Sequence, residues 1–260
     1  MSIDMQKEMV IMTMDSKSNI VFNVSGGQVN IAKDNGHIVA IQNNDFEGNR
    51  EDGRNSEEWM LIIQKWCEYI DIDNWEVWTS YLLGSGLPRL RVDRADKLDE
   101  LRQWILRRVW PMGCDEVRES LLNFYAVLND FINLFHEHSE NKGTVYFTDK
   151  FYHINQWDTE LYDKLLLEFR NHVNLVNDMV LEMTRAANYV CDMVRQYIAP
   201  GFRIEEGMLV VVTGPNMELA YDTLRPEYRG EDRKTHAPYK GLEQFKKDRY
   251  NRDFYWGQAE

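Results

Sequence analysis

The stretch LYDKLLLEFRNHVNLVNDMVLEMTRAANYVCDMVRQYI, residues 161–198, determines the architecture of this 260-residue chain. Within it an apolar residue recurs every three or four positions, which is the period of one helix face. That face consists of Leu161, Leu165, Phe169, Val173, Val176, Val180, Met183, Ala187, Val190, Val194 and Ile198. Pro200-Gly201 ends the pattern. We therefore expect a helix over residues 157–198, about 60 Å long at about 1.5 Å per residue.

Three further segments have helical periodicity and predict helices near 56–70, 95–109 and 115–139. Their apolar faces are Trp59, Ile62, Ile63, Trp66, Tyr69 and Ile70; then Leu98, Leu101, Ile105 and Val109; then Val117, Leu121, Phe124, Leu128, Phe131 and Phe135. Thr144–Tyr152 is expected to form a short strand or an ordered loop. Met208–Thr213 is β-branched and is expected to contribute to a small strand pair. The predicted fold class is mainly α, a helical domain with long antiparallel helices.

Charge and hydropathy exclude several classes of function. The formal net charge is −13, the pI is about 5.0 and the mean hydropathy is −0.55. An acidic surface does not hold nucleic acid or anionic lipid, and the chain lacks an apolar run of about 18 residues that would span a bilayer. We expect no nucleic-acid partner and no stable membrane insertion.

The N-terminus lacks a basic region followed by an apolar one, so we expect no signal peptide. Cys67, Cys114 and Cys191 are odd in number and far apart. Their spacing fits neither a metal knuckle nor a disulfide framework. Buried free thiols in a cytoplasmic protein are the expected state.

Aromatic residues divide the chain into two unlike parts. Of 8 Trp, 13 Tyr and 11 Phe residues, only Phe22 and Phe46 precede position 56. We divide the chain into a β-prone region over 1–44, a polar linker over 45–55, an α-helical domain over 56–224 and a charged tail over 225–260.

The β-prone region has the composition of a segment that stacks into amyloid-type assemblies. From Ser18 to Ala32 there is no charged residue, and Asn and Gln recur through position 44. In a cross-β stack, apolar side chains interdigitate and amide side chains form hydrogen-bonded ladders. Gly26-Gly27 and Asn35-Gly36 supply tight bends. The β-prone region therefore predicts homotypic assembly.

These residues resemble the RIP homotypic interaction motif of animal necroptosis signalling, and more closely the similar amyloid signalling motifs of bacteria. The resemblance covers about 25 of the 260 residues. The predicted homotypic interaction motif lies in this stretch. It consists of Val24, Ser25, Gly26, Gly27, Gln28, Val29, Asn30, Ile31, Asn35, Gly36 and Ile38. Asn30 replaces a Gly that often follows the Gln-Val or Gln-Ile pair, which separates this chain from the animal form.

The resemblance implies a non-enzymatic adaptor or effector of bacterial antiviral defence, which assembles with itself or with a second protein that carries a similar motif. A homo-oligomer is expected. The alternative is an oligomeric helical scaffold with an ordinary β-meander of Asn19–Val24, Gln28–Ala32 and His37–Gln42.

The other end of the chain carries a shorter likeness. Pro238-Tyr239-x-Gly241-Leu242-x-x-Phe245, followed by Phe254-x-x-Gly257, resembles the entry segment of bacterial STAND NTPases. Gln258 stands where that family has Arg, and the chain ends at Glu260. The likeness implies an adaptor whose NTPase is a separate protein, or a docking tail.

Catalytic and cofactor motifs are missing from the sequence, so we expect no catalytic residue, metal or cofactor. The one candidate polar site is a stripe on the long helix, Arg185, Asn188, Asp192 and Arg195. It is either a solvated face with intrahelical ion pairs or a buried polar network. In the second case, a helical ligand-binding or enzymatic effector would use it with His136, His138 or His172.

Overall fold

The computed structural model describes residues 28–32, 38–42, 50–155, 158–215 and 218–257. The chain divides into two compact units, Met1–Arg50 and Glu51–Glu260, which are considered separately.

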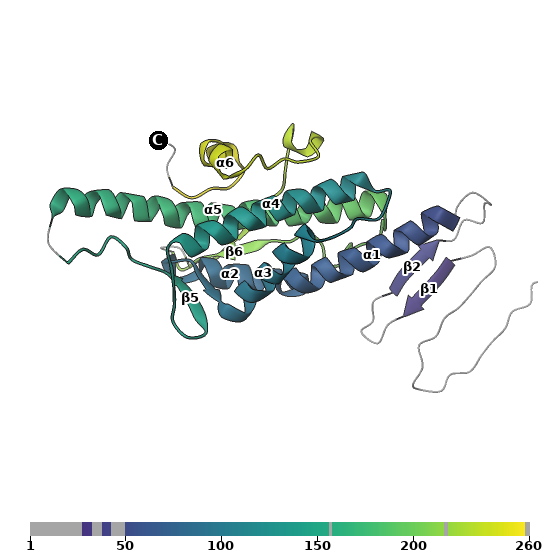
Figure 1. The fold of residues 1–260 in the computed structure, drawn as a ribbon, viewed down its shortest axis with the longest axis horizontal. Helices are drawn as coiled ribbons and strands as arrows, with labels where there is room; N and C mark the ends of the chain where they lie inside the picture. Colours follow the sequence, from purple (N-terminus) through teal and green to yellow (C-terminus); the bar gives the residue numbers. More distant parts are fainter. Residues whose placement is uncertain (1–27, 33–37, 43–49, 156–157, 216–217, 258–260) are drawn as a thin grey trace, which may run out of the picture. The chain divides into compact units, whose positions relative to one another are not determined.

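The helical unit confirms the mainly α fold class (Figure 1). Its α-helices are α1 (Arg50–Ile70), α2 (Trp75–Leu83), α3 (Val92–Leu106), α4 (Asp115–Glu137), α5 (Thr159–Tyr197) and α6 (Leu242–Asp248). Short 3₁₀ helices are η1 (Ile72–Asn74), η2 (Gly84–Gly86), η3 (Asp232–Lys234) and η4 (Arg249–Asn251). Asp158 caps the N-terminus of α5, because its carboxylate accepts a hydrogen bond from the backbone N–H of Leu161.

The predicted helices exist, but three of their ends differ by three residues or more: the start of α1 and both ends of α3, which begins at Val92 instead of residue 95. α1 begins at Arg50 instead of residue 56, so the second half of the predicted 45–55 linker is helical. α3 ends at Leu106, and Val109 is 89% exposed rather than on the buried face. Pro111 disfavours helical backbone just before it.

The described residues of the helical unit form two small sheets. One has the strand order β3 (Arg89–Arg91), β5 (Val145–Thr148), β4 (Ser139–Asn141), and both pairings are antiparallel. The other pairs β6 (Val211–Thr213) with β7 (Asp222–Leu224). β5 lies within Thr144–Tyr152, so of the two alternatives for that segment the strand is the one observed. The pairing of β6 with β7 confirms the strand pair expected at Met208–Thr213.

The core lies between α4, α5 and the helices α1 to α3. α4 and α5 lie side by side and antiparallel (Figure 1), with residue 123 of α4 near 182 of α5 and residue 138 near 172. All six predicted core residues of α4 are buried. Trp59 and Trp66 of α1 are fully buried, and Trp66 meets Phe124 edge-on at 5.5 Å.

The middle of α5 is buried on every side. Its apolar face enters the core as predicted, and the opposite face, including Glu182, Arg185 and Asn188, is also buried. The cover is the C-terminal segment, residues 225–257, in which Tyr228, Tyr239 and Phe245 are buried. The interpretation of 225–260 as a separate tail is therefore corrected for residues 225–257, because they complete the helical unit.

In the N-terminal unit, β1 (Gln28–Ala32) pairs with β2 (Ile38–Gln42) in antiparallel orientation. The register places Gln28 opposite Gln42 and Ala32 opposite Ile38. These strands correspond to two of the three strands in the alternative meander. The other one, Asn19–Val24, lies outside the described residues.

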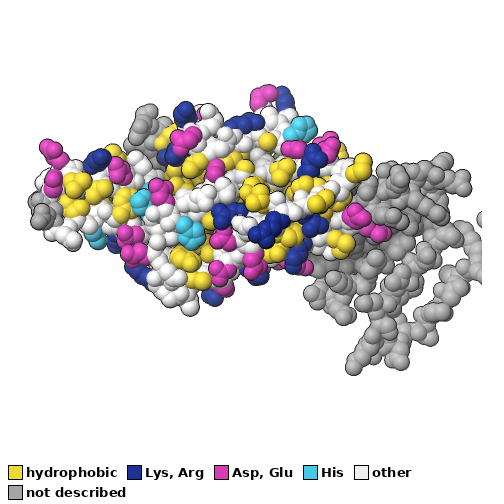
Figure 2. All heavy atoms as spheres, in the orientation of Figure 1, with side chains coloured by type: hydrophobic (Ala, Val, Ile, Leu, Met, Phe, Trp, Pro, Cys, Tyr) yellow, Lys and Arg dark blue, Asp and Glu magenta, His cyan; other side chains and the backbone are white. Residues whose placement is uncertain are grey.

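Acidic and basic side chains are interspersed with apolar ones on the face shown in Figure 2. Among the described residues, no helix combines the length and apolar character needed to cross a bilayer.

Candidate functional site

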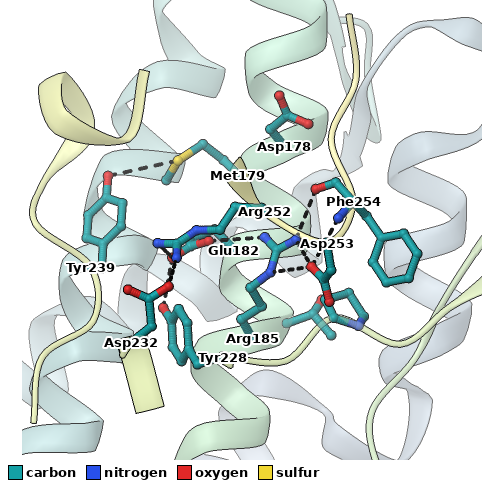
Figure 3. A network of polar contacts seen from close by, with 12 residues as sticks. Asp178, Met179, Glu182, Arg185, Tyr228, Asp232, Tyr239, Arg252, Asp253 and Phe254 are labelled. Carbon is teal, nitrogen blue, oxygen red and sulfur yellow. Dashed lines mark hydrogen bonds and ion pairs between the residues drawn. The ribbon is translucent and has the colours of Figure 1, made fainter. Parts of the chain in front are cut away.

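The most concentrated group of polar side chains lies between α5 and the C-terminal segment (Figure 3). Three ionisable residues of α5, Asp178, Glu182 and Arg185, are at most 1% exposed. Their spacings of four and three residues place them on one helix face. Charged groups are almost never buried so deeply unless they are paired.

Arg185 connects α5 to the last described residues of the chain. Its Nη1 donates to Glu182 Oε2 at 3.1 Å, and its Nη2 donates to Asp253 Oδ1 at 2.5 Å. Nε also donates to Asp253 Oδ1, at 3.0 Å, and Nη2 donates to the carbonyl of Phe254 at 3.0 Å. The guanidinium therefore neutralises a carboxylate on each side.

Glu182 is the centre of the network. Its Oε1 accepts from the hydroxyl of Tyr228 at 2.9 Å and from Arg252 Nη2 at 3.2 Å. Arg252 in turn forms an ion pair with Asp232. Burial raises the pKa of Tyr228 well above its ordinary value, and the Glu182 carboxylate adds to this effect. The tyrosine therefore acts as a donor to Glu182.

Asp178 anchors the segment one turn before Glu182. Oδ2 accepts from Arg249 Nη1 at 2.6 Å, and Oδ1 accepts from the backbone N–H of Trp256 at 2.6 Å. Burial raises the pKa of Asp178 to about 6, although Trp256 N–H, Arg249 and Arg185 oppose the shift. Asp178 therefore changes its charge near neutral pH.

The same segment is also attached to α4. The backbone N–H of Tyr239 donates to Asn123 Oδ1 at 2.9 Å, and the Tyr239 hydroxyl donates to Asp130 Oδ2 at 2.8 Å. That oxygen also accepts from the N–H of Leu242 at the start of α6, at 3.1 Å. Gly241 precedes α6 with φ +92°, a conformation that favours glycine. The Pro-Tyr-x-Gly-Leu motif here fastens α6 to α4.

The charged groups of the network mostly pair with one another, and few of them line an open space. Beside the network lies a hollow of about 520 Å³ lined by Leu181, Thr213, β7 and residues Asp253–Trp256. The charged group from the network in this lining is Asp253, whose Oδ1 is already paired with Arg185. Chemically, this arrangement holds the C-terminal segment on the bundle.

The structure splits the predicted polar stripe into three parts. Arg185 belongs to the ionic network. Asn188 is buried and binds backbone: Nδ2 donates to the carbonyls of Leu209 and Pro226 at 3.0 Å, and Oδ1 accepts from Leu209 N–H at 2.9 Å. Asp192 and Arg195 form an i,i+3 ion pair at 2.6 Å, and Arg233 joins Asp192 at 3.0 Å.

Asn188→Ala is expected to lower the free energy of unfolding by about 1–3 kcal/mol, because it leaves buried backbone groups of Leu209 and Pro226 without partners. Chemical denaturation of the full chain measures the loss. Asn171→Ala is the matched control, since Asn171 is an exposed residue of the same helix. Equal losses in the two variants would contradict this role of Asn188.

Sequence reasoning missed Asp178, Glu182 and their partners in the C-terminal segment. A signal was present, because Asp178 and Glu182 continue the Arg185 stripe toward the N-terminus of α5 at helical spacing. Arg249, Arg252 and Asp253 gave no comparable signal, because only the fold brings them to α5.

The histidines considered at the sequence level separate in the structure. His136 lies with Nδ1 3.2 Å from Ser139 Oγ. His138 and His172 lie together, with ring centroids 4.8 Å apart. Cys191 is buried as expected, whereas Cys67 and Cys114 are half-buried. Burial raises the pKa of the Cys67 and Cys191 thiols, that of Cys191 to about 12.

The predicted interaction motif is described in part. Gln28, Val29, Asn30 and Ile31 belong to β1, and Ile38 opens β2. The motif residues Val24, Ser25, Gly26, Gly27, Asn35 and Gly36 lie outside the described residues.

Neither the scan against protein-family models nor the searches of curated proteins and of solved structures found a match for this chain.

Proposed function

We propose that this chain is a non-enzymatic signalling protein, an adaptor or effector of bacterial antiviral defence, that assembles through residues 20–44. The observation that carries the proposal is the charge-free, Asn- and Gln-rich sequence around Gln28-Val29-Asn30-Ile31, with its likeness to bacterial amyloid signalling motifs. The partner is a second copy of the chain or another protein with a similar motif.

The pairing of β1 with β2 is compatible with a resting form that can convert. Among the described residues, this sheet has two strands, and an isolated two-stranded hairpin is at best marginally stable in water. In a cross-β stack each strand pairs instead with the same strand of the chains above and below. Assembly would therefore exchange intrachain hydrogen bonds for intermolecular ones at little cost.

The division of the chain supports the same proposal. Residues 1–50 form a unit of their own. In the helical unit, the buried charged groups of the network pair with one another. A motif that belongs to a separate unit can stack without unfolding its carrier. The helical unit is then the part that senses a signal or acts once the motif has assembled.

Val29→Asp in the full chain is expected to abolish assembly, because each added chain would place its carboxylate directly above that of the previous chain in the stack. Thioflavin fluorescence and sedimentation measure assembly at high protein concentration. We expect the wild-type chain to form thioflavin-positive particles after a lag, and Val29→Asp to stay in the supernatant.

Val77→Asp is the matched control, since Val77 is 69% exposed on α2 and receives the same charge. This variant should assemble as the wild-type chain does. Circular dichroism should show equal helix content in all three proteins. A wild-type chain that remains monomeric, or a Val29→Asp chain that assembles normally, would refute the proposal.

A further inference from the structure

Three potential metal ligands lie close together where the C-terminal end of α4 packs beside α5. Glu137, His138 and His172 each offer one ligand atom, and these atoms all lie within 4.8 Å of one another. Glu137 Oε1 is 3.9 Å from His138 Nε2. The group therefore joins the last turn of α4 and its C-cap to α5.

His172 is held in place but lacks a partner for one ring nitrogen. The residue is 8% exposed, and its Nε2 is buried without a hydrogen-bond partner in the part of the chain that the structure describes. A bound ion is one of the explanations for an unpartnered buried atom of this kind.

The aromatic surroundings orient the second histidine. The ring of Phe151 stacks on that of His138 with centroids 4.0 Å apart. Stacking covers a face of the imidazole and leaves its nitrogens, which lie in the ring plane, available for bonding. The rings of His138 and His172 are nearly perpendicular, at 88°.

We propose that Glu137, His138 and His172 bind a divalent transition-metal ion, with Zn²⁺ as the preferred ion. Two imidazoles and one carboxylate form a ligand set that suits Zn²⁺, and three protein ligands leave a fourth position for water or another ligand. Magnesium and calcium prefer oxygen ligands, so this set disfavours them.

The distances require a small adjustment that the exposed residues can make. Ligand atoms of a tetrahedral Zn²⁺ site lie about 3.3 Å apart, given bonds of about 2.0–2.1 Å. Glu137 and His138 have side chains that are 63% and 33% exposed, so they can rotate toward the fixed His172. The ion would then clamp the end of α4 onto α5.

The test is metal binding by the full-length chain after chelator treatment. Isothermal titration with Zn²⁺ should give one site per chain, and Co²⁺ should give the visible absorption bands of a tetrahedral complex. Glu137→Gln and His138→Gln should each weaken Zn²⁺ binding by at least about tenfold, since even the loss of outer-shell partners costs about 10–100-fold. Both side chains are exposed enough for the variants to fold.

His136→Gln is the matched control, since it removes a histidine from the same end of α4 but not from the cluster. It should bind Zn²⁺ as the wild-type chain does. Zn²⁺ should raise the melting temperature of the wild-type and His136→Gln chains, and much less that of His138→Gln. Absence of a stoichiometric site, or loss of binding in His136→Gln alone, would overturn the proposal. It is independent of the assembly motif, so Val29→Asp should bind Zn²⁺ normally.

Discussion

Replacing Arg185 with methionine is expected to lower the free energy of unfolding by about 3–5 kcal/mol, the cost of removing one partner from a buried ion pair. Methionine fills similar space but cannot donate to Glu182 or Asp253. Glu182 keeps Arg252 and Tyr228 as partners. Asp253 keeps only the guanidinium of Arg229, at 3.8 Å, among its described ion pairs.

Urea denaturation of the full chain, followed by circular dichroism, measures this loss. Arg118→Met is the matched control: Arg118 also forms an i,i+3 ion pair on a helix, with Asp115 at 3.0 Å, but its side chain is 35% exposed. Exposed pairs contribute about 0–1 kcal/mol. If both variants lose the same small amount, the buried network does not hold the segment.

Arg185→Met has two effects: it removes hydrogen bonds, and it leaves the Asp253 carboxylate without the Arg185 guanidinium. A second substitution separates them. Asp253→Asn in the Arg185→Met background removes the carboxylate that Arg185 neutralised. The double variant should therefore lose clearly less than the sum of the two single losses, as expected for residues in direct contact. Additive losses would mean that Arg185 and Asp253 act independently.

The sequence could predict those parts of the fold that depend on local periodicity. The core residues of α4, such as Phe124 and Phe131, recur at helical spacing and are buried as expected. Most of the α5 face is buried too, but Leu161 at its start is 43% exposed. Periodicity identifies the face that can be buried; it does not show how far along the helix the neighbours extend.

The C-terminal segment could not be placed from the sequence for a related reason. Arg249 and Arg252 are charged and follow a short helix, so local rules assign them to solvent. Their burial depends on carboxylates of α5 about 70 residues earlier in the chain. Pairing over such a distance leaves no periodic signal. For the same reason, the sequence left open whether Arg185 lies on a solvated face or in a buried network. The C-terminal segment that covers it decides between the two.

The same distant pairing makes the stability of the protein sensitive to pH through Asp178. The pKa of this carboxyl in the folded chain is about 6, above its ordinary value of 3.8. Between these values the folded chain binds more protons than the unfolded chain. The contribution of Asp178 to stability is therefore most favourable at low pH and falls as the pH rises through 6.

Arg249→Met should make this dependence steeper. Arg249 is one of the groups that lower the pKa of Asp178, together with Trp256 N–H and Arg185. Without its guanidinium, an ionised Asp178 is buried with too little compensation, and the loss of stability at pH 8 should reach about 3–5 kcal/mol. At pH 5 the carboxyl binds a proton instead, so the loss should be smaller by about 2 kcal/mol.

Urea denaturation of the wild-type and Arg249→Met chains at pH 5 and pH 8 measures this difference, and subtraction at each pH removes effects common to both proteins. Asp178→Asn in the Arg249→Met background is the control, because its amide does not titrate. In that background the change between pH 5 and pH 8 should shrink to that of the remaining groups. If the Arg249→Met loss is equal at both pH values, then Asp178 is not the carboxyl that Arg249 keeps ionised.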